Sequence, residues 1–222
     1  MKISILIAIV ISFTSCLTSL HPLVTADKVV SEDRVVGNWV HDDVTIHIER
    51  FLQSEVYKNL TKMSGGLNNF NNGNAALQKQ DSILYAHGYS VSYRKDGVDY
   101  FMFGAVTKIG NNFYFDLLPV IADDPKNQEG TGFEYTNDYL PAFTMAKLEI
   151  NKNALNLHFL DGDFIKAQIK SGNMRIKHEK DAMFETFVVT ASSVELRQFI
   201  EKYGHDERLF DKENSVTLTR KG

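Results

Sequence analysis

Alternation of apolar and polar residues dominates the chain from residue 34 onward. A β-branched run at residues 34–40 and an alternating run at residues 44–48 predict two strands. Alternating, aromatic-rich runs then follow one another, and several are separated by turn signals such as Asp96-Gly97. These runs predict strands at residues 83–94, 98–109, 113–120, 143–150, 154–160, 174–179, 184–190 and 214–220.

Helical spacing interrupts the strands at three places. Apolar residues at Leu52, Val56, Leu60 and Met63 predict a helix near residues 50–63. A short helix is expected at residues 163–170, where Asp161 or Asp163 can cap the start and Ser171-Gly172 ends it. Residues 64–76 and 122–138 are polar and predict exposed loops.

The helix with the strongest sequence signal covers residues 193–203. Ser192 and Glu195 form a capping box, and Gly204 ends the element. Its apolar face, expected to pack on the sheet, consists of Leu196, Phe199, Ile200 and Tyr203. Many short antiparallel strands with one late helix predict a single mainly β domain over residues 34–222, closed into a barrel or a barrel-like sandwich, with one or two further short helices.

Two sets of residues carry a resemblance to known proteins. Gly37-Asn38-Trp39 on the first strand, followed by meandering strands, resembles the Gly-x-Trp opening of lipocalins and other calycins. GNNFYFDLLP, LPAFTMAKLEI and FLDGDFIKAQI, with the late capped helix, resemble a group of uncharacterised bacterial lipoproteins and secreted proteins. The resemblance implies an antiparallel calycin-like barrel, and it implies no activity.

Strand periodicity places Arg220 on the same face as Val216 and Leu218. Trp39 shares its face with Gly37. Lipocalins close their barrels with a similar Trp and Arg stack, so the resemblance implies that Trp39 and Arg220 meet. The alternative is that Arg220, close to the end of the chain, extends into water.

The beginning of the chain has the pattern of an export signal. After Met1-Lys2, residues 3–13 are apolar apart from two serines, which is too short for a membrane span of ~20 residues but fits a signal peptide. Phe13-Thr14-Ser15-Cys16 resembles a bacterial lipobox, and Cys16 is the only cysteine. The resemblance implies a signal peptide over residues 1–15, an acylated Cys16 anchored in the membrane, and a tether over residues 16–33.

Two alternatives to lipid anchoring at Cys16 stay open. A lone cysteine beside an apolar run can arise by chance, and Val24-Thr25-Ala26 offers a small-residue site whose cleavage would give a secreted protein. In lipoproteins of this type an Asp after the cysteine favours the inner membrane. Leu17 stands there instead, so the resemblance favours the outer membrane.

Composition narrows the possible partners. The 222 residues carry a formal net charge of -4 without a basic block, which argues against nucleic acid as a partner. A mature chain without a second cysteine has no disulfide framework, and no cofactor-binding motif is present.

The candidate chemistry is sparse. His41, Asp42, Asp43 and His47 form the densest polar cluster, which is better interpreted as exposed loop and strand residues than as a metal site. Asp161-Gly162-Asp163 indicates a turn and helix cap rather than calcium binding. Asp116 is a carboxylate within an apolar strand, expected to pair with a cation or cap a turn, with catalysis as the lesser alternative.

Nothing catalytic can be assembled from these residues, so an enzyme is not expected. Two functional classes remain. One is a binding module whose barrel holds a small apolar or amphipathic ligand at the cell envelope. The other is a structural or interaction lipoprotein whose barrel is filled by its own side chains and whose loops contact other envelope proteins.

Overall fold

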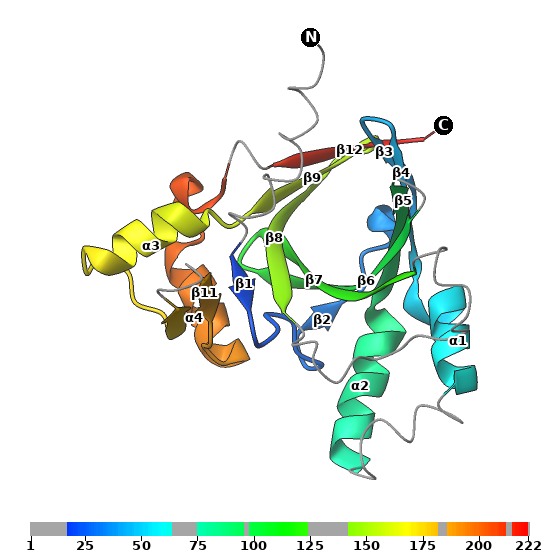
Figure 1. The fold of residues 1–222 in the computed structure, drawn as a ribbon, viewed down its shortest axis with the longest axis horizontal. Helices are drawn as coiled ribbons and strands as arrows, with labels where there is room; N and C mark the ends of the chain where they lie inside the picture. The colour runs from blue at the N-terminus through cyan, green and yellow to red at the C-terminus, as the bar shows by residue number, and fades with distance from the viewer. Residues whose placement is uncertain are drawn as a thin grey trace.

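Eight antiparallel strands close into a barrel in the computed structural model, which describes residues 17–63, 75–95, 98–123, 142–181, 186–211 and 215–221 (Figure 1). Each strand pairs with the next in sequence, and the last one pairs with both β9 and β3. The predicted mainly β barrel is therefore confirmed. Its strands are β3 (Gly37–His41), β4 (Val44–Arg50), β5 (Tyr89–Lys95), β6 (Val98–Ile109), β7 (Asn112–Asp123), β8 (Phe143–Ile150), β9 (Ala154–Phe159) and β12 (Val216–Arg220).

The inner face of the barrel is occupied by every second residue of the strands, as strand periodicity requires. One buried cluster joins side chains from all eight strands, with Trp39 and Tyr89 fully buried. At one end, called here the closed end, lie Gly37, Tyr89 and Arg220. The buried members of the cluster are Val35, Trp39, Ile48, Tyr89, Val91, Val106, Phe115, Leu117, Ala146, Leu148, Leu155, Leu157, Phe159 and Leu218.

Two sets of elements, the first helical and the second made of helices and two short strands, cover the outside of the barrel on opposite sides (Figure 1). On one side, Phe51 and Val56 pack with Phe103 in a small aromatic cluster. On the other side a larger apolar layer lies against the outer faces of β6, β7 and β8. The first set comprises η3 (Phe51–Gln53), α1 (Glu55–Met63) and α2 (Ala75–His87), and the second comprises α3 (Gly162–Lys170), β10 (His178–Asp181), β11 (Thr186–Val189), α4 (Ser193–Tyr203) and η5 (Glu207–Leu209).

Helix α4 has the ends and the packing face that its sequence predicts. The Ser192 side chain accepts a hydrogen bond from the Glu195 amide, and the Glu195 carboxylate accepts from the Ser192 amide. Leu196, Phe199 and Ile200 are buried in the outer apolar layer, together with Ile109, Tyr114 and Met145 of the barrel. The helix thus closes over the outside of the barrel.

The predicted strand at residues 83–94 is confirmed from Tyr89 onward, but its first part is wrong. Residues 83–87 belong to α2, and β5 begins only at Tyr89. The run Ile83-Leu84-Tyr85 fits either element, and packing decides, because the Tyr85 ring lies 5.2 Å from the ring of Phe51. Residues 174–177 are also outside any strand, and β10 starts at His178. Most of the predicted loops at 64–76 and 122–138 lies outside the described residues.

Residues 17–32, called here the N-terminal strap, differ most from expectation. A tether was predicted over residues 16–33, but β1 (Thr18–Ser19) pairs with both β8 and β11, and β2 (Val29–Val30) pairs with β6. The strap therefore runs down the outside of the barrel to η2 (Asp33–Val35) at the closed end. Its apolar side chains explain the docking, because Leu17, Leu23 and Val24 are at most 4% exposed.

Candidate functional site

Trp39 and Arg220, predicted to meet, are in contact at the closed end. The Arg220 guanidinium lies 4.2 Å from the centroid of the Trp39 ring, and the two residues are direct partners across β3 and β12. The guanidinium also donates to the backbone oxygen of Val36 at 3.2 Å and to that of Arg34 at 2.9 Å. The Trp39 indole donates to the Val35 oxygen at 2.8 Å. Arg220 therefore joins the last strand to the segment that enters the first one.

Gly37 is required by this arrangement. Its φ of +146° is one that side-chain-bearing residues rarely adopt, and a Cβ there would lie 2.6 Å from Nη1 of Arg220. The glycine of the Gly-x-Trp triplet thus makes room for the guanidinium, which in turn covers the tryptophan.

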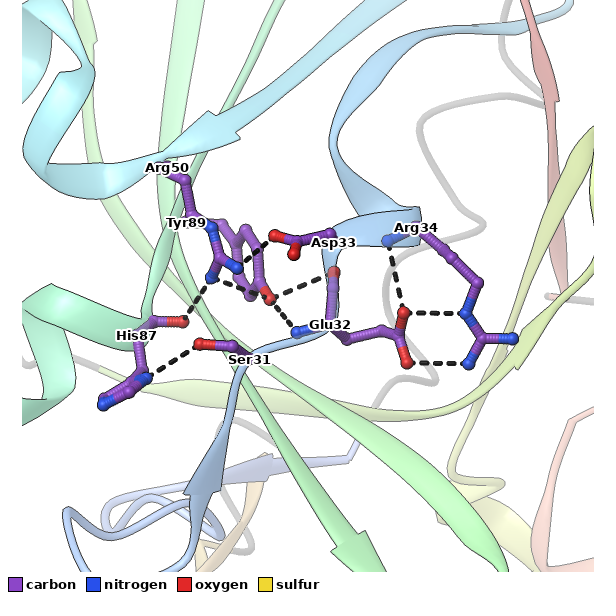
Figure 2. A network of polar contacts seen from close by, with 7 residues as sticks. All are labelled: Ser31, Glu32, Asp33, Arg34, Arg50, His87 and Tyr89. Atoms are coloured by element: carbon purple, nitrogen blue, oxygen red, sulfur yellow. Dashed lines mark hydrogen bonds and ion pairs between the residues drawn. The ribbon is translucent and has the colours of Figure 1, made fainter.

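A polar network fastens the strap beside this contact (Figure 2). The Tyr89 hydroxyl accepts from the Glu32 amide at 2.6 Å and donates to the Glu32 oxygen at 3.1 Å. Arg50 lies 5.0 Å above the Tyr89 ring, donates to the Tyr89 hydroxyl, and forms an ion pair with Asp33. Burial raises the pKa of the Tyr89 phenol, so it stays protonated and can keep donating.

Two further pairs extend the network on either side (Figure 2). Glu32 accepts two hydrogen bonds of 2.7 Å from the Arg34 guanidinium, and this pairing lowers the pKa of Glu32. Ser31 and His87 are hydrogen-bonded at 2.7 Å. Every named group in the network is held by another protein group, and together these contacts fasten the strap to the closed end of the barrel.

Asp116 holds the middle of the strap. It lies on the outer face of β7 and is 3% exposed, and its Oδ2 accepts from the amides of Leu23 at 2.7 Å and Val24 at 3.1 Å. Among the described residues its Oδ1 is buried without a hydrogen-bond partner. Burial raises the pKa of Asp116 from 3.8 to about 7, although the two amides act in the opposite direction.

The strap covers Asp116, so this carboxyl faces backbone amides rather than a cavity. The cation expected beside it is replaced by the amides of Leu23 and Val24. No sequence pattern reveals such a partner. Leu23 and Val24 are separated from Asp116 by 93 and 92 positions, and any residue other than proline has a backbone amide that could donate in the same way. The contacts of Tyr89 are equally hidden in the sequence, because its hydroxyl binds backbone groups of the strap residue Glu32.

The other candidate residues lie apart or have structural roles. Asp161 caps α3 by accepting from the Phe164 amide at 2.8 Å, as its sequence predicts. His47 is hydrogen-bonded to Asn38 at 2.8 Å, while His41 is hydrogen-bonded to the Thr217 oxygen at 3.1 Å. In the part of the chain that the structure describes, no three His, Cys, Asp or Glu side chains converge as metal ligands.

The lipidation candidate Cys16 lies outside the described residues, one position before the buried Leu17. None of the helices in the described ranges is long and apolar enough to cross a membrane. Comparison of the chain with protein families, curated proteins and solved structures finds no match.

Proposed function

We propose that the protein is a lipid-anchored protein of the bacterial cell envelope, attached through acylated Cys16, whose filled barrel serves as a scaffold for interactions made on its outside. The observation that carries the proposal is the packed strap. Leu17, directly after Cys16, is 4% exposed and begins the segment that β8 and β11 hold. A mature chain that starts at Cys16 keeps this segment, and its lipid would hold the domain against the membrane without a linker.

Cleavage after Ala26 fits the packing poorly. It would remove β1 together with the buried side chains of Leu17, Leu23 and Val24, each worth about 1.5–3 kcal/mol of burial. It would also remove the amides of Leu23 and Val24, the two donors that hold the Asp116 carboxyl on the outside of the barrel. These losses favour Cys16 over Asp27 as the first residue of the mature protein.

The packing of the barrel interior favours a structural scaffold over a barrel that holds a ligand. Side chains from all eight strands form one buried cluster, and Val35, Trp39 and Arg220 close one end of it. An eight-stranded barrel is just wide enough for its own side chains to fill or for one small ligand. Here large side chains such as Trp39, Tyr89 and Phe115 occupy the closed half.

Metabolic labelling with palmitate tests the anchor. The protein should carry the label and fractionate with membranes, whereas Cys16→Ser should lose the label and leave the membrane fraction. Ala26→Gln, which blocks the alternative cleavage site and leaves the lipobox intact, is the matched control and should behave as wild type. Label retained in Cys16→Ser, or lost in Ala26→Gln, would contradict the proposal.

A small apolar ligand inside the barrel is the second candidate, favoured by one observation. Toward the end opposite Arg220, inner side chains such as Ile46, Tyr93 and Met102 are only half-buried. Calorimetric titration with dodecanol separates the two candidates. The scaffold predicts no saturable binding, whereas a ligand site at this end predicts one that Ile46→Glu abolishes.

A further inference from the structure

A groove on the outside of the barrel, beside α4, has the features of a binding site. It lies between α4 and the segment that follows α3, and its volume is about 770 Å³. This volume falls within the roughly 300–1,000 Å³ typical of small-molecule sites. Helix α4 forms one wall, and residues 172–178 form the other.

The floor of the groove is apolar and firmly built. Met174 and Phe199 are each 5% exposed and belong to the outer apolar layer, and Ile176 packs against that layer. The two walls are joined across the groove. Lys177 forms a 2.7 Å ion pair with Glu195 of α4, and the Tyr203 hydroxyl donates to the Asn173 oxygen at 3.4 Å.

The rim of the groove is positively charged although the protein is acidic. Arg175, Lys177 and Lys202 line it, whereas Glu195 is the only carboxylate among the lining residues, and the whole chain carries -4. Glu195 is already paired with Lys177. Among the described residues, neither Arg175 nor Lys202 has a carboxylate within ion-pair distance, so two exposed cations face an apolar floor without a counter-charge.

We propose that this groove binds a dissolved single-chain amphiphile with an anionic head group, of the fatty-acid type. The alkyl chain would lie over Ile176, which is half-buried, and over the exposed edges of Met174 and Phe199. The apolar surface removed from water would be mainly that of the alkyl chain itself. The head group would lie between Arg175 and Lys202, which supply charge-assisted hydrogen bonds. This site is separate from the filled barrel and does not depend on whether Cys16 is acylated.

Calorimetric titration of the purified protein with monomeric laurate tests the proposal. One laurate should bind per chain. Decanoate, which lacks two methylene groups, should bind about tenfold more weakly, and dodecylammonium should show no saturable binding. The double charge reversal Arg175→Glu/Lys202→Glu should weaken laurate binding at least tenfold.

Two control variants locate the site. Lys79→Glu/Lys152→Glu makes the same change in net charge at exposed lysines outside the groove and should leave laurate affinity unchanged. Ile46→Glu, which would block a site in the barrel, should also leave it unchanged. The proposal would be overturned if laurate does not bind to the wild-type protein, or if it binds equally well to Arg175→Glu/Lys202→Glu. It would also be overturned if Ile46→Glu abolishes laurate binding.

A bilayer surface is the competing source of anionic head groups. Co-sedimentation with phosphatidylglycerol vesicles distinguishes it, because a groove that takes a dissolved amphiphile predicts the same vesicle binding for wild type and for the Arg175→Glu/Lys202→Glu variant. If the reversal abolishes vesicle binding while laurate shows no site, the groove is a membrane contact and the proposal is wrong.

Discussion

Replacing Asp116 with asparagine should remove a loss of folding stability that occurs in the wild-type protein as pH rises. The carboxyl is 3% exposed, and burial raises its pKa from 3.8 to about 7. The folded protein therefore binds this proton more tightly than the unfolded chain does. Between pH 4 and pH 7 the unfolded state loses the proton first, so the free energy of unfolding falls as pH rises.

The size of the effect follows from the pKa change. A rise from 3.8 to about 7 corresponds, at about 1.4 kcal/mol for each pH unit, to an upper bound of about 4 kcal/mol lost between pH 4 and pH 8. Asp116→Asn keeps an oxygen that can accept from the amides of Leu23 and Val24 but carries no charge. At pH 8 the variant should be more stable than wild type by about 2–4 kcal/mol, whereas at about pH 3, below the pKa of the unfolded chain, the two should nearly coincide.

Urea unfolding followed by the emission of Trp39, the only tryptophan and fully buried, measures this difference. Asp43→Asn, which changes an exposed carboxylate, is the control and should shift neither curve. Equal stabilities of Asp116→Asn and wild type at both pH values would refute the reasoning. That result would mean that Asp116 titrates alike in the folded and unfolded states.

Three further substitutions test the closed end and the outer layer by chemical unfolding. Gly37→Ala should lower the free energy of unfolding by about 1–3 kcal/mol, because it strains the backbone and places Cβ against the Arg220 guanidinium; a neutral result would remove the role assigned to this glycine. Arg220→Ala should cost about 2–4 kcal/mol through its lost cation–π contact and hydrogen bonds, with Arg220→Lys intermediate; equal stability of Arg220→Ala and wild type would contradict the closure. Phe199→Ala should cost about 3–5 kcal/mol, whereas Val194→Ala on the same helix, 66% exposed, should stay within about 0.5 kcal/mol; similar losses in both would mean that α4 is loosely attached.

The barrel could be predicted because its information is local. Alternation with a period of two places Trp39 and Arg220 on the inner face, and both lie there in contact. The capping box of α4 is equally local, since Ser192 and Glu195 are three positions apart. The strand predicted at residues 83–87 was wrong because the local pattern of Ile83-Leu84-Tyr85 fits both the strand period and the helix period. Only the contact of Tyr85 with Phe51, which is distant in sequence, favours the helix.

The strap and the groove could not be predicted because they depend on distant partners. The apolar residues of 17–32 follow neither the helix nor the strand period. Their packing also depends on a β7 carboxyl that binds backbone amides and on the free edges of β8 and β6. In the groove, Arg175 and Lys202 look like ordinary surface cations in the sequence. Only the fold brings them to one apolar floor.

Mass spectrometry of the N-terminal peptide from cells tests the central claim most directly. A protein anchored through Cys16, with its strap packed on the barrel, predicts a peptide that begins at Cys16, carries diacylglycerol and an amide-linked acyl chain, and continues unbroken through Ala26. A mature chain that begins at Asp27, or an unmodified Cys16, would contradict it.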